Sequence, residues 1–432
     1  MSADAPLIVL DDDPTGAQAQ AGVPVALEWG AELLAAVAET KPPAVHLLTN
    51  TRALSADRAR VVTGEAAAAA AAAFPGSRVV LRGDSTLRAH LLPEYVGLRD
   101  AVFPGRTPVL MLVPALPAAG RVTEGGVHYL EQDGERTTLE RTEYARDPDF
   151  AYASARLLVW AQERSGGFFP AAAGRELQLQ QLRGEGPRAV ADALVELSAR
   201  RAPAVLAVDS VADADLEIVA AGLREAERAG ADVAVRSAPA LVGILSGAAA
   251  AGYQPLPRSQ SAVLVLCGSH VQRSTRQLEA LARQRPESVV WVRPERLVNG
   301  RGAEEIALAA AAATERLDAG GLAVVATSRA VLASADRPQA GAAIASGLAA
   351  ILARVREHAD VVVSKGGITS AVNLREGLQS ELAEVLGPLR DGISLWSVDT
   401  PERTGMSFVV FPGNVGGDDA LAELVEQIAA PS

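Results

Sequence analysis

Short apolar runs recur along the chain, and most of them end at a polar or glycine-marked stretch. Runs of this length that are rich in Val, Ile and Leu are typical of buried strands. Residues 56–73 and 215–229 lie between such runs and have the composition or spacing of helices. Strand, loop and helix in this alternation predict parallel βαβ units. In the first half the apolar runs are residues 7–10, 45–48, 79–81, 108–113 and 204–208.

The same rhythm restarts after residues 252–260, which contain two prolines and few apolar residues. The next expected strands are 262–266, 322–326, 360–363 and 407–411, with helices at 272–284 and 340–355. We therefore predict an α/β protein of two α/β domains with largely parallel sheets. The expected division is residues 1–251, a linker at 252–260, and residues 261–432.

Composition narrows the possible functions of the 432-residue chain. A net charge of −12 without runs of Lys or Arg argues against nucleic-acid binding. The single cysteine, Cys267, permits no internal disulfide and fits a cytoplasmic location. The beginning of the chain lacks the pattern of a signal peptide, and the alanine runs are too weakly apolar to span a membrane. Alanine-rich helices are compatible with a homodimer.

The stretch from Arg82 to Arg88 (Arg-Gly-Asp-Ser-Thr-Leu-Arg) combines a carboxylate, two hydroxyls and two guanidinium groups after an expected strand. Two arginines suit planar capture of a carboxylate or phosphate, and Asp84 is able to accept a proton or hold a metal. The alternative is a turn in which Asp84 and Ser85 bond to their own backbone. The residues by themselves leave both interpretations open.

A second acidic stretch, Asp11-Asp12-Asp13-Pro14-Thr15-Gly16, follows the first expected strand. In open α/β sheets ligands bind just beyond such strand ends. Three adjacent carboxylates repel one another unless a cation, a positive substrate group or water compensates them. Thr15 adds a hydroxyl. The alternative is a helix N-cap, which requires only one of the three aspartates.

Glycine-rich turns characterise the second half. Lys365-Gly366-Gly367 follows an expected strand, and a double glycine lets backbone N–H groups approach a phosphate closely. It is not a Walker A loop, because the lysine precedes the glycines. Gly413 and Asn414 form a second such turn, and Gly268-Ser269 a third. Acidic and arginine-bearing loops in one half and phosphate loops in the other are what a small-molecule kinase requires, with Mg²⁺ bridging the phosphates of ATP.

With these motifs in place, the sequence resembles the four-carbon acid sugar kinases, a former family of unknown function of which some members are labelled Hrp-dependent type III effectors. The likeness covers nearly the whole chain. It implies ATP-dependent phosphorylation of the terminal hydroxyl of a tetronate or 3-oxo-tetronate, with the acid bound by the N-terminal domain and the nucleotide by the C-terminal domain. The motifs that carry it are residues 12–16, 84–88, 114–123, 146–148, 268–269, 366–369 and 412–414.

The resemblance implies positions for both sites. The expected acid-sugar residues are Asp12, Asp13, Asp84, Ser85 and Arg88. The expected nucleotide residues are Ser269, Gly366, Gly367, Ile368, Thr369, Gly413 and Asn414, to which we add Lys365. Asp13 or Asp84 is the expected base, Arg88 with Arg82 the expected carboxylate contact, and Thr15 a further substrate contact. No residue is predicted as a metal ligand.

Three residues depart from the pattern of the family. Ala89 stands where a glycine is usual, and Pro14 replaces an apolar residue, both next to the expected acid site. Phe411 stands where a lysine often precedes Pro-Gly-Asn, which removes a possible phosphate contact.

Two rival functions are also compatible with parts of the sequence. The Asp-x-Asp-x-Thr pattern of residues 11–15 fits a haloacid-dehalogenase-type sugar phosphatase, although no later strand supplies the acidic pair that completes its magnesium site. A catalytically silent sugar-acid-binding protein is the other rival, and Ala89 and Phe411 are its only support.

Overall fold

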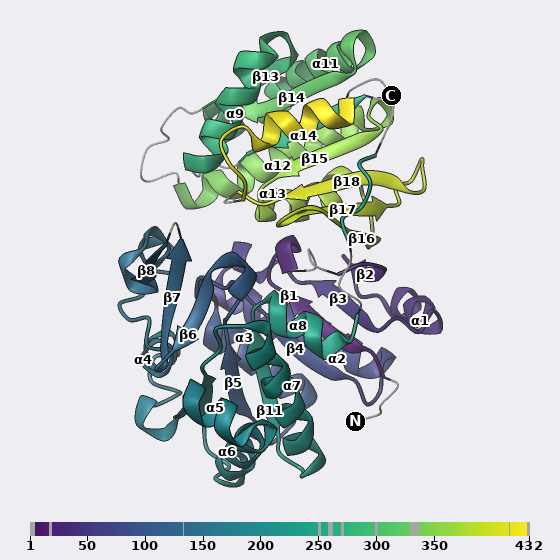
Figure 1. Cartoon of the computed structure of the whole chain (residues 1–432). Coiled ribbons are helices and arrows are strands. Elements are labelled where there is room, and N and C mark those ends of the chain that lie inside the picture. Colours follow the sequence, from purple (N-terminus) through teal and green to yellow (C-terminus); the bar gives the residue numbers. More distant parts are fainter. Residues whose placement is uncertain are drawn as a thin grey trace. The chain divides into compact units, whose positions relative to one another are not determined.

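The computed structural model describes residues 5–16, 20–132, 134–248, 252–257, 262–268, 272–298, 301–328, 337–413 and 415–429. The chain forms two compact units (Figure 1). Unit 1 comprises Met1–Gly16 and Glu28–Ala248, and unit 2 comprises Ala17–Leu27 and Ala249–Ser432. Each unit contains a largely parallel sheet with helices packed on it, which confirms the predicted α/β fold class.

The sheet of unit 1 has the strand order β3-β1-β4-β11-β5-β10-β9, and every neighbouring pair is parallel. The chain leaves β1 toward β3 on one side and returns to β4 on the other. This reversal makes the carboxyl ends of β1 and β4 the switch point at which ligands bind in such sheets. The strands are β1 (Leu7–Asp11), β3 (Ala44–Leu48), β4 (Arg78–Arg82), β5 (Val109–Val113), β9 (Arg175–Leu177), β10 (Val205–Val208) and β11 (Val233–Ser237).

The helices of unit 1 pack on this sheet in two groups. Helices α2 and α3 pack against each other beside β4, whereas α6, α7 and α8 form the second group (Figure 1). Local chemistry fixes some helix starts: Asp215 accepts hydrogen bonds from the backbone N–H groups of Val211 and Ala212, each 3.0 Å long. The helices are α1 (Ala31–Glu39), α2 (Ala56–Ala73), α3 (Leu91–Val102), α4 (Leu157–Arg164), α5 (Leu179–Glu185), α6 (Pro187–Ala199), α7 (Asp213–Arg228) and α8 (Pro239–Ser246).

A small antiparallel sheet of β6 (Arg121–Glu124), β7 (Val127–Gln132) and β8 (Glu135–Thr138) also belongs to unit 1. Asp209 ties it to the main sheet, because its carboxylate accepts the N–H groups of Gly125 at 2.7 Å and Gly126 at 2.9 Å. This attachment brings His128 of β7 behind the loop that follows β4, where it contacts Ser85.

The sheet of unit 2 has a parallel part, β13-β14-β12-β15-β18, continued by the antiparallel strands β17, β16 and β2. Its core is built of Val, Leu, Ala and Ile, as expected for a chain with few aromatic residues. The strands are β2 (Val23–Ala26), β12 (Val263–Cys267), β13 (Val289–Val292), β14 (Leu322–Thr327), β15 (Val361–Lys365), β16 (Leu382–Arg390), β17 (Ile393–Val398) and β18 (Met406–Phe411).

Strand β2 belongs to unit 2 although it precedes most of unit 1 in the sequence, so unit 2 is discontinuous. The sequence-based division placed all of residues 1–251 in one domain, whereas residues 17–27 cluster with unit 2. The physical reason is pairing: Val23 and Val25 lie opposite Val385 and Ala383 of β16. A four-residue strand carries no local signal of a partner more than 350 residues away.

The helices of unit 2 are α9 (Gln272–Gln284), α10 (Pro294–Val298), α11 (Gly302–Gly320), α12 (Arg337–Val355), α13 (Gly367–Val372) and α14 (Ala420–Ala429), and a π-helical turn, Asn373–Gly377, extends α13. The bounds of α2 and α9 agree with those expected from the sequence. None of the helices in the described part of the chain is long and apolar enough to cross a membrane.

The close packing of α2 on α3 yields a stability prediction. A Cβ atom placed on Gly97 of α3 would lie 2.5 Å from the backbone oxygen of Arg60 in α2, so Gly97→Ala forces the helices apart. We expect a loss of about 1–3 kcal/mol in the free energy of unfolding, measured by chemical denaturation. Gly243→Ala in α8, where a Cβ meets nothing within 4 Å, is the matched control and should be neutral or stabilising. Equal effects of the two variants would contradict this packing.

Candidate functional site

A single guanidinium group, that of Arg82 at the end of β4, binds the acidic stretch at the end of β1. Arg82 Nε donates to Asp11, Nη1 donates to Asp12 at 2.9 Å, and Nη2 donates to Asp13 at 3.0 Å. Asp11 and Arg82 lie opposite each other in the parallel register of β1 and β4, which makes these contacts possible. All four side chains are buried. The cation required by three adjacent carboxylates is therefore supplied by the protein.

Burial and charge act differently on two of these carboxyl groups. Burial acts to raise the pKa of Asp11, but the charge of Arg82 and the hydrogen bond of the His46 ring outweigh it, so this pKa is lowered. Burial raises the pKa of Asp12, against the opposing charges of Arg52 and Arg82. Asp12 Oδ2 is buried and has no hydrogen-bond partner among the described residues.

The loop after β4 forms a second charged group centred on Asp84. Arg88 Nε donates to Asp84 Oδ2 at 2.7 Å, the Thr86 hydroxyl donates to the same oxygen, and Arg88 also lies 3.5 Å from Asp147. Burial opposes ionisation of Asp84, but Arg88 and Arg52 override it and hold the pKa of this carboxyl well below its usual range. Asp84 is thus a firmly ionised group at the site.

Two side chains, those of His128 and Tyr152, contact backbone carbonyl groups of the loop that follows β4. His128 lies 2.9 Å from the Ser85 carbonyl oxygen through Nε2, and the Tyr152 hydroxyl donates to the Thr86 carbonyl at 3.0 Å. Between them Leu87 adopts a left-handed conformation with φ of 67°, which a leucine occupies only when its surroundings enforce it. The loop that carries Asp84 and Arg88 is therefore fixed before any ligand arrives.

Arg52 joins the two acidic groups into one cluster. It lies in the short turn Thr51–Ala53 after β3, where it pairs with Asp13 and approaches Asp84 to 3.6 Å. The sequence analysis did not include Arg52 among the site residues. The rule that ligands bind beyond the carboxyl ends of parallel strands would also have selected Arg52. Strand β3 lies beside β1 and ends at the same edge of the sheet.

Two predicted residues, Thr15 and Ser85, have structural roles in this cluster. Thr15 donates both its backbone N–H and its hydroxyl to Asp13, so Asp13 caps the short turn Pro14–Gly16 as the N-cap alternative proposed. Asp13 nevertheless also binds Arg82 and Arg52. Ser85 is buried and contributes its carbonyl oxygen to His128. The predicted acid-site residues lie in the two loops at the switch point, except Arg82, which is the last residue of β4.

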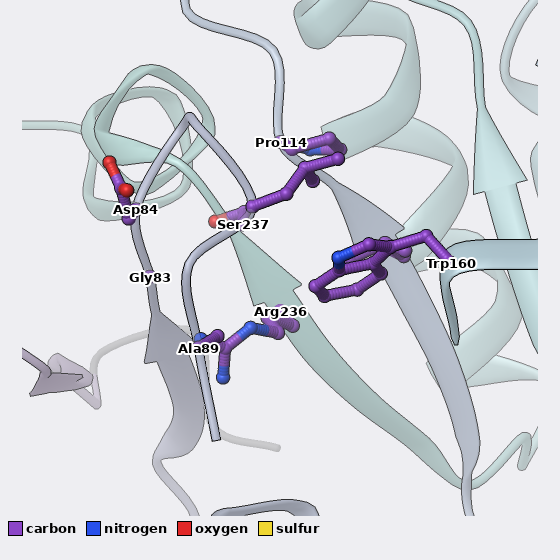
Figure 2. Close-up of a pocket in the computed structure, with 9 residues that line it drawn as sticks. Gly83, Asp84, Ala89, Pro114, Trp160, Arg236 and Ser237 are labelled. Carbon is purple, nitrogen blue, oxygen red and sulfur yellow. The ribbon is translucent and has the colours of Figure 1, made fainter. Parts of the chain in front are cut away.

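A pocket adjoins this cluster within unit 1. Figure 2 shows it at the ends of neighbouring strands, with Trp160 on one side and Arg236 beneath the loop of Gly83 and Asp84. The sequence analysis missed Arg236 and Trp160; an arginine among the apolar residues of β11 was the available signal. Its lining residues are Gly83, Asp84, Leu87, Ala89, Leu112, Pro114, Trp160, Arg236 and Ser237.

In unit 2 the predicted glycine turns lie at the ends of adjacent strands. Gly366 has φ of 111°, a conformation that favours glycine, and its N–H donates to the Phe411 carbonyl at 2.8 Å. Thr369 is close to the end of β12, because a Cβ placed on Gly268 would lie 3.3 Å from its hydroxyl. Gly367 begins α13, and Ile368 is exposed. Ser269 and Asn414 lie outside the described residues.

Lys365 lies between these turns at the end of β15. Its ammonium donates to the Pro412 carbonyl and lies 3.7 Å from the centre of the Phe411 ring. Burial lowers the pKa of Lys365 to about 7, a shift that Arg273 reinforces and Cys267 opposes. Lys365 and Phe411 lie opposite each other on neighbouring strands. The ammonium of Lys365 is therefore beside position 411, where the resemblance led us to expect a lysine.

Helix α9 fixes the second glycine turn. Ser274 donates to the Gly413 carbonyl at 3.0 Å, and the Gln277 amide donates to the carbonyls of Val415 and Gly417 at 2.9 and 2.7 Å. Sequence reasoning missed both side chains, because a polar residue within an amphipathic helix gives no sign of which loop it contacts.

The described residues contain no group of three or more His, Cys, Asp or Glu side chains arranged to hold a metal ion. At the densest acidic cluster, Asp11 to Asp13, the Arg82 guanidinium lies where a cation would bind. Among the described residues, therefore, no cluster of acidic side chains is arranged as a magnesium site.

Comparison with known families assigns a ligand class to each half. Residues 7–245 match the family described as a sugar-binding N-terminal domain, and residues 264–421 match the one described as a nucleotide-binding C-terminal domain. The chain is thus a two-domain α/β protein with one domain for a sugar and one for a nucleotide. It belongs to the DUF1537 family, the four-carbon acid sugar kinase family, which confirms the resemblance found in the sequence.

Solved structures support the same fold. A Salmonella typhimurium LT2 protein described as a candidate tRNA synthase matches with a TM-score of 0.70 and 20% identity, over 98% of this chain and 99% of that chain. A Haemophilus influenzae protein of the DUF1537 family matches with a TM-score of 0.63 and 18% identity, over 98% and 100%. At such identities the likeness shows the fold alone. No curated protein matches the chain.

The contact between His128 and the loop after β4 yields a pH prediction. Burial lowers the pKa of His128 from 6.5 to about 4, so the unfolded chain binds the extra proton first. The free energy of unfolding therefore has its full value above pH 6.5, where His128 is neutral in both states. It decreases by about 3 kcal/mol in total as the pH drops toward 4. His128→Gln should flatten the fall in unfolding free energy between these pH values, whereas His358→Gln, at an exposed position, should retain it. Parallel pH profiles of the two variants would refute this role.

Proposed function

We propose that the protein is an ATP-dependent kinase that phosphorylates the terminal hydroxyl of a four-carbon sugar acid, a tetronate or 3-oxo-tetronate. The coarser part of this statement rests on the family matches, since a sugar-binding and a nucleotide-binding domain in one chain indicate a sugar kinase. The four-carbon acid as substrate is the part that we add.

The observation that carries the proposal is the ionised cluster at the switch point of unit 1. Asp13 and Asp84 are joined by Arg52, and Arg88 lies on the more open side of the same loop. Arginine and aspartate side chains in this proximity bind the carboxylate and hydroxyl oxygens of a small polar acid. A neutral sugar would not require so many guanidinium groups beside its binding loops.

In the proposed reaction, Asp13 or Asp84 accepts the proton of the attacking hydroxyl, and Arg88 contacts the acid. The turns at Gly366 and Gly413 hold the triphosphate, and Lys365 fixes these two turns relative to each other through the Pro412 carbonyl. Phosphoryl transfer needs mainly positioning and charge neutralisation, which groups held in this way provide.

Magnesium enters this proposal with ATP. Because no described cluster of acidic side chains is arranged to hold a metal, we assign no step to a protein-bound ion. The metal supplies charge neutralisation on the phosphates when MgATP binds. That the protein forms a homodimer and is located in the cytoplasm are predictions made from the sequence.

The contacts of the aspartates after β1 argue against the rival function, a haloacid-dehalogenase-type phosphatase. Its chemistry requires a magnesium ion at the aspartates after β1, and Arg82 binds all three of them instead. The nucleotide-binding match of residues 264–421 would also have no role in a phosphatase.

The first prediction of this proposal is turnover. A coupled ADP-release assay with MgATP should show activity with at least one member of a panel of D- and L-threonate, D- and L-erythronate and their 3-oxo forms. The matched tetritols, which lack the carboxylate, should give no activity. Silence across the whole panel would overturn the proposed substrate class.

The second prediction concerns Arg88. Arg88→Ala removes a charge-assisted contact with the acid, so the KM for the acid should rise about tenfold or more while the KM for ATP stays unchanged. Arg106→Ala is the matched control, because Arg106 is an exposed arginine of unit 1 paired with Asp232. Wild-type kinetics in Arg88→Ala would refute the contact.

A further inference from the structure

Two polar residues at the end of β11 are not used by the proposed reaction. Arg236 and Ser237 end the strand that lies between β4 and β5, and Ser237 is opposite Arg82 on one side and Val113 on the other. The Gly83 N–H donates to the Ser237 carbonyl at 2.9 Å, so this strand end is joined directly to the loop that carries Asp84. Both residues line the pocket of unit 1 (Figure 2).

The Arg236 guanidinium is buried and held from one side only. Arg236 is 4% exposed, and its Nη1 donates to one carboxylate oxygen of Glu94. The other oxygen of Glu94 accepts the Thr51 hydroxyl at 2.6 Å, which fixes the carboxylate. Glu94 therefore both balances the buried charge and orients the guanidinium.

The remaining donors of this pair have no acceptor. Arg236 Nη2 and Ser237 Oγ are both buried and make no hydrogen bond with any described residue. A buried donor without a partner costs about 1–3 kcal/mol, so two such donors on residues that line one pocket point to a ligand that supplies acceptors. Gly83 preserves this access, because a Cβ at its position would lie 2.5 Å from Arg236 Nη2.

The rest of the pocket restricts the type of ligand. Its other walls are mainly apolar, formed by Leu87, Ala89, Leu112, Pro114 and Trp160. Asp84 is the other charged lining residue, and it is already paired with Arg88 and Arg52. A guanidinium N–H in mainly apolar surroundings suits a carboxylate oxygen, since charge-assisted hydrogen bonds strengthen where water is excluded.

The other arginines of the cluster are less suited to this task. Arg82 is committed through Nε, Nη1 and Nη2 to the three aspartates after β1. Arg88 is bound to Asp84 and lies close to Asp147. Arg236 is the arginine of this cluster whose Nη2 is buried in the pocket and free of any described partner.

We propose that Arg236 and Ser237 form the subsite for the carboxylate of the sugar acid, with Glu94 as the residue that positions Arg236. The identity of the acid rests on the proposed function, but binding by this subsite does not require phosphoryl transfer. This assignment replaces the sequence-based one, which gave the carboxylate to Arg88 and Arg82, and it leaves Arg88 to contact a hydroxyl group of the acid.

The test measures binding of the four-carbon acids to the full-length protein without ATP, by isothermal titration calorimetry and thermal shift. The probes are D- and L-threonate and D- and L-erythronate, with threitol and erythritol as neutral counterparts. The variants are Arg236→Gln and Ser237→Ala. Thr63→Val is the matched control, because Thr63 also carries a buried hydroxyl without a described partner, on α2 and outside the pocket.

We expect the wild type to bind at least one acid and neither tetritol. Each subsite variant should bind that acid about tenfold to a hundredfold more weakly, as is typical of losing a hydrogen bond in a charged pair. Thr63→Val should bind it normally. Ser237→Ala keeps the test valid if Arg236→Gln fails to fold, since it removes only an unsatisfied hydroxyl and a purely structural serine would leave affinity unchanged.

Two results would overturn the subsite: undiminished affinity for the acid in folded Arg236→Gln or Ser237→Ala, or a wild type that binds none of the acids. Failure of the kinase proposal looks different. In that case the acid binds and binding depends on Arg236 and Ser237, but no ADP is released with MgATP.

Discussion

The sugar-binding half of the molecule depends on the burial of one guanidinium group among three consecutive carboxylates. Without Arg82, the aspartates after β1 would repel one another in a region from which water is excluded. With it, the two strands flanking the switch point are joined at their carboxyl ends by ion pairs as well as by backbone hydrogen bonds. Arg52 and Arg88 then extend this charge balance outward to Asp84.

The sequence predicted the α/β fold class, because apolar runs are local signals. It also predicted strands β1, β3, β4, β5, β10, β12, β14, β15 and β18, but not β2, β11 or β13. It did not predict which charges compensate one another. Arg82 was expected to contact substrate and is instead occupied by aspartates, since parallel register places it opposite Asp11. Arg236 was not recognised, because β11 enters the sheet between β4 and β5, out of chain order. Register and strand order are non-local properties.

In the nucleotide half the corresponding constraint is a buried lysine. Lys365 connects the ends of β15 and β18 through the Pro412 carbonyl and the Phe411 ring, and α9 holds the second turn from its other side. The resemblance led us to expect a lysine at position 411, where Phe411 stands, and Lys365 lies opposite it on the neighbouring strand. A sequence read position by position records only that difference, whereas the structure shows the ammonium in the same neighbourhood.

Strand β2 also affects how the two units can be separated. Because β2 completes the antiparallel edge of unit 2, the polypeptide passes between the units three times, at residues 16–17, 27–28 and 248–249. A single cleavage at the proline-containing stretch near residue 252 would therefore yield no fragment with a whole unit 2. The nucleotide-binding unit is built from two segments that are separated by more than 200 residues of unit 1, and the acidic stretch after β1 directly precedes the first of them.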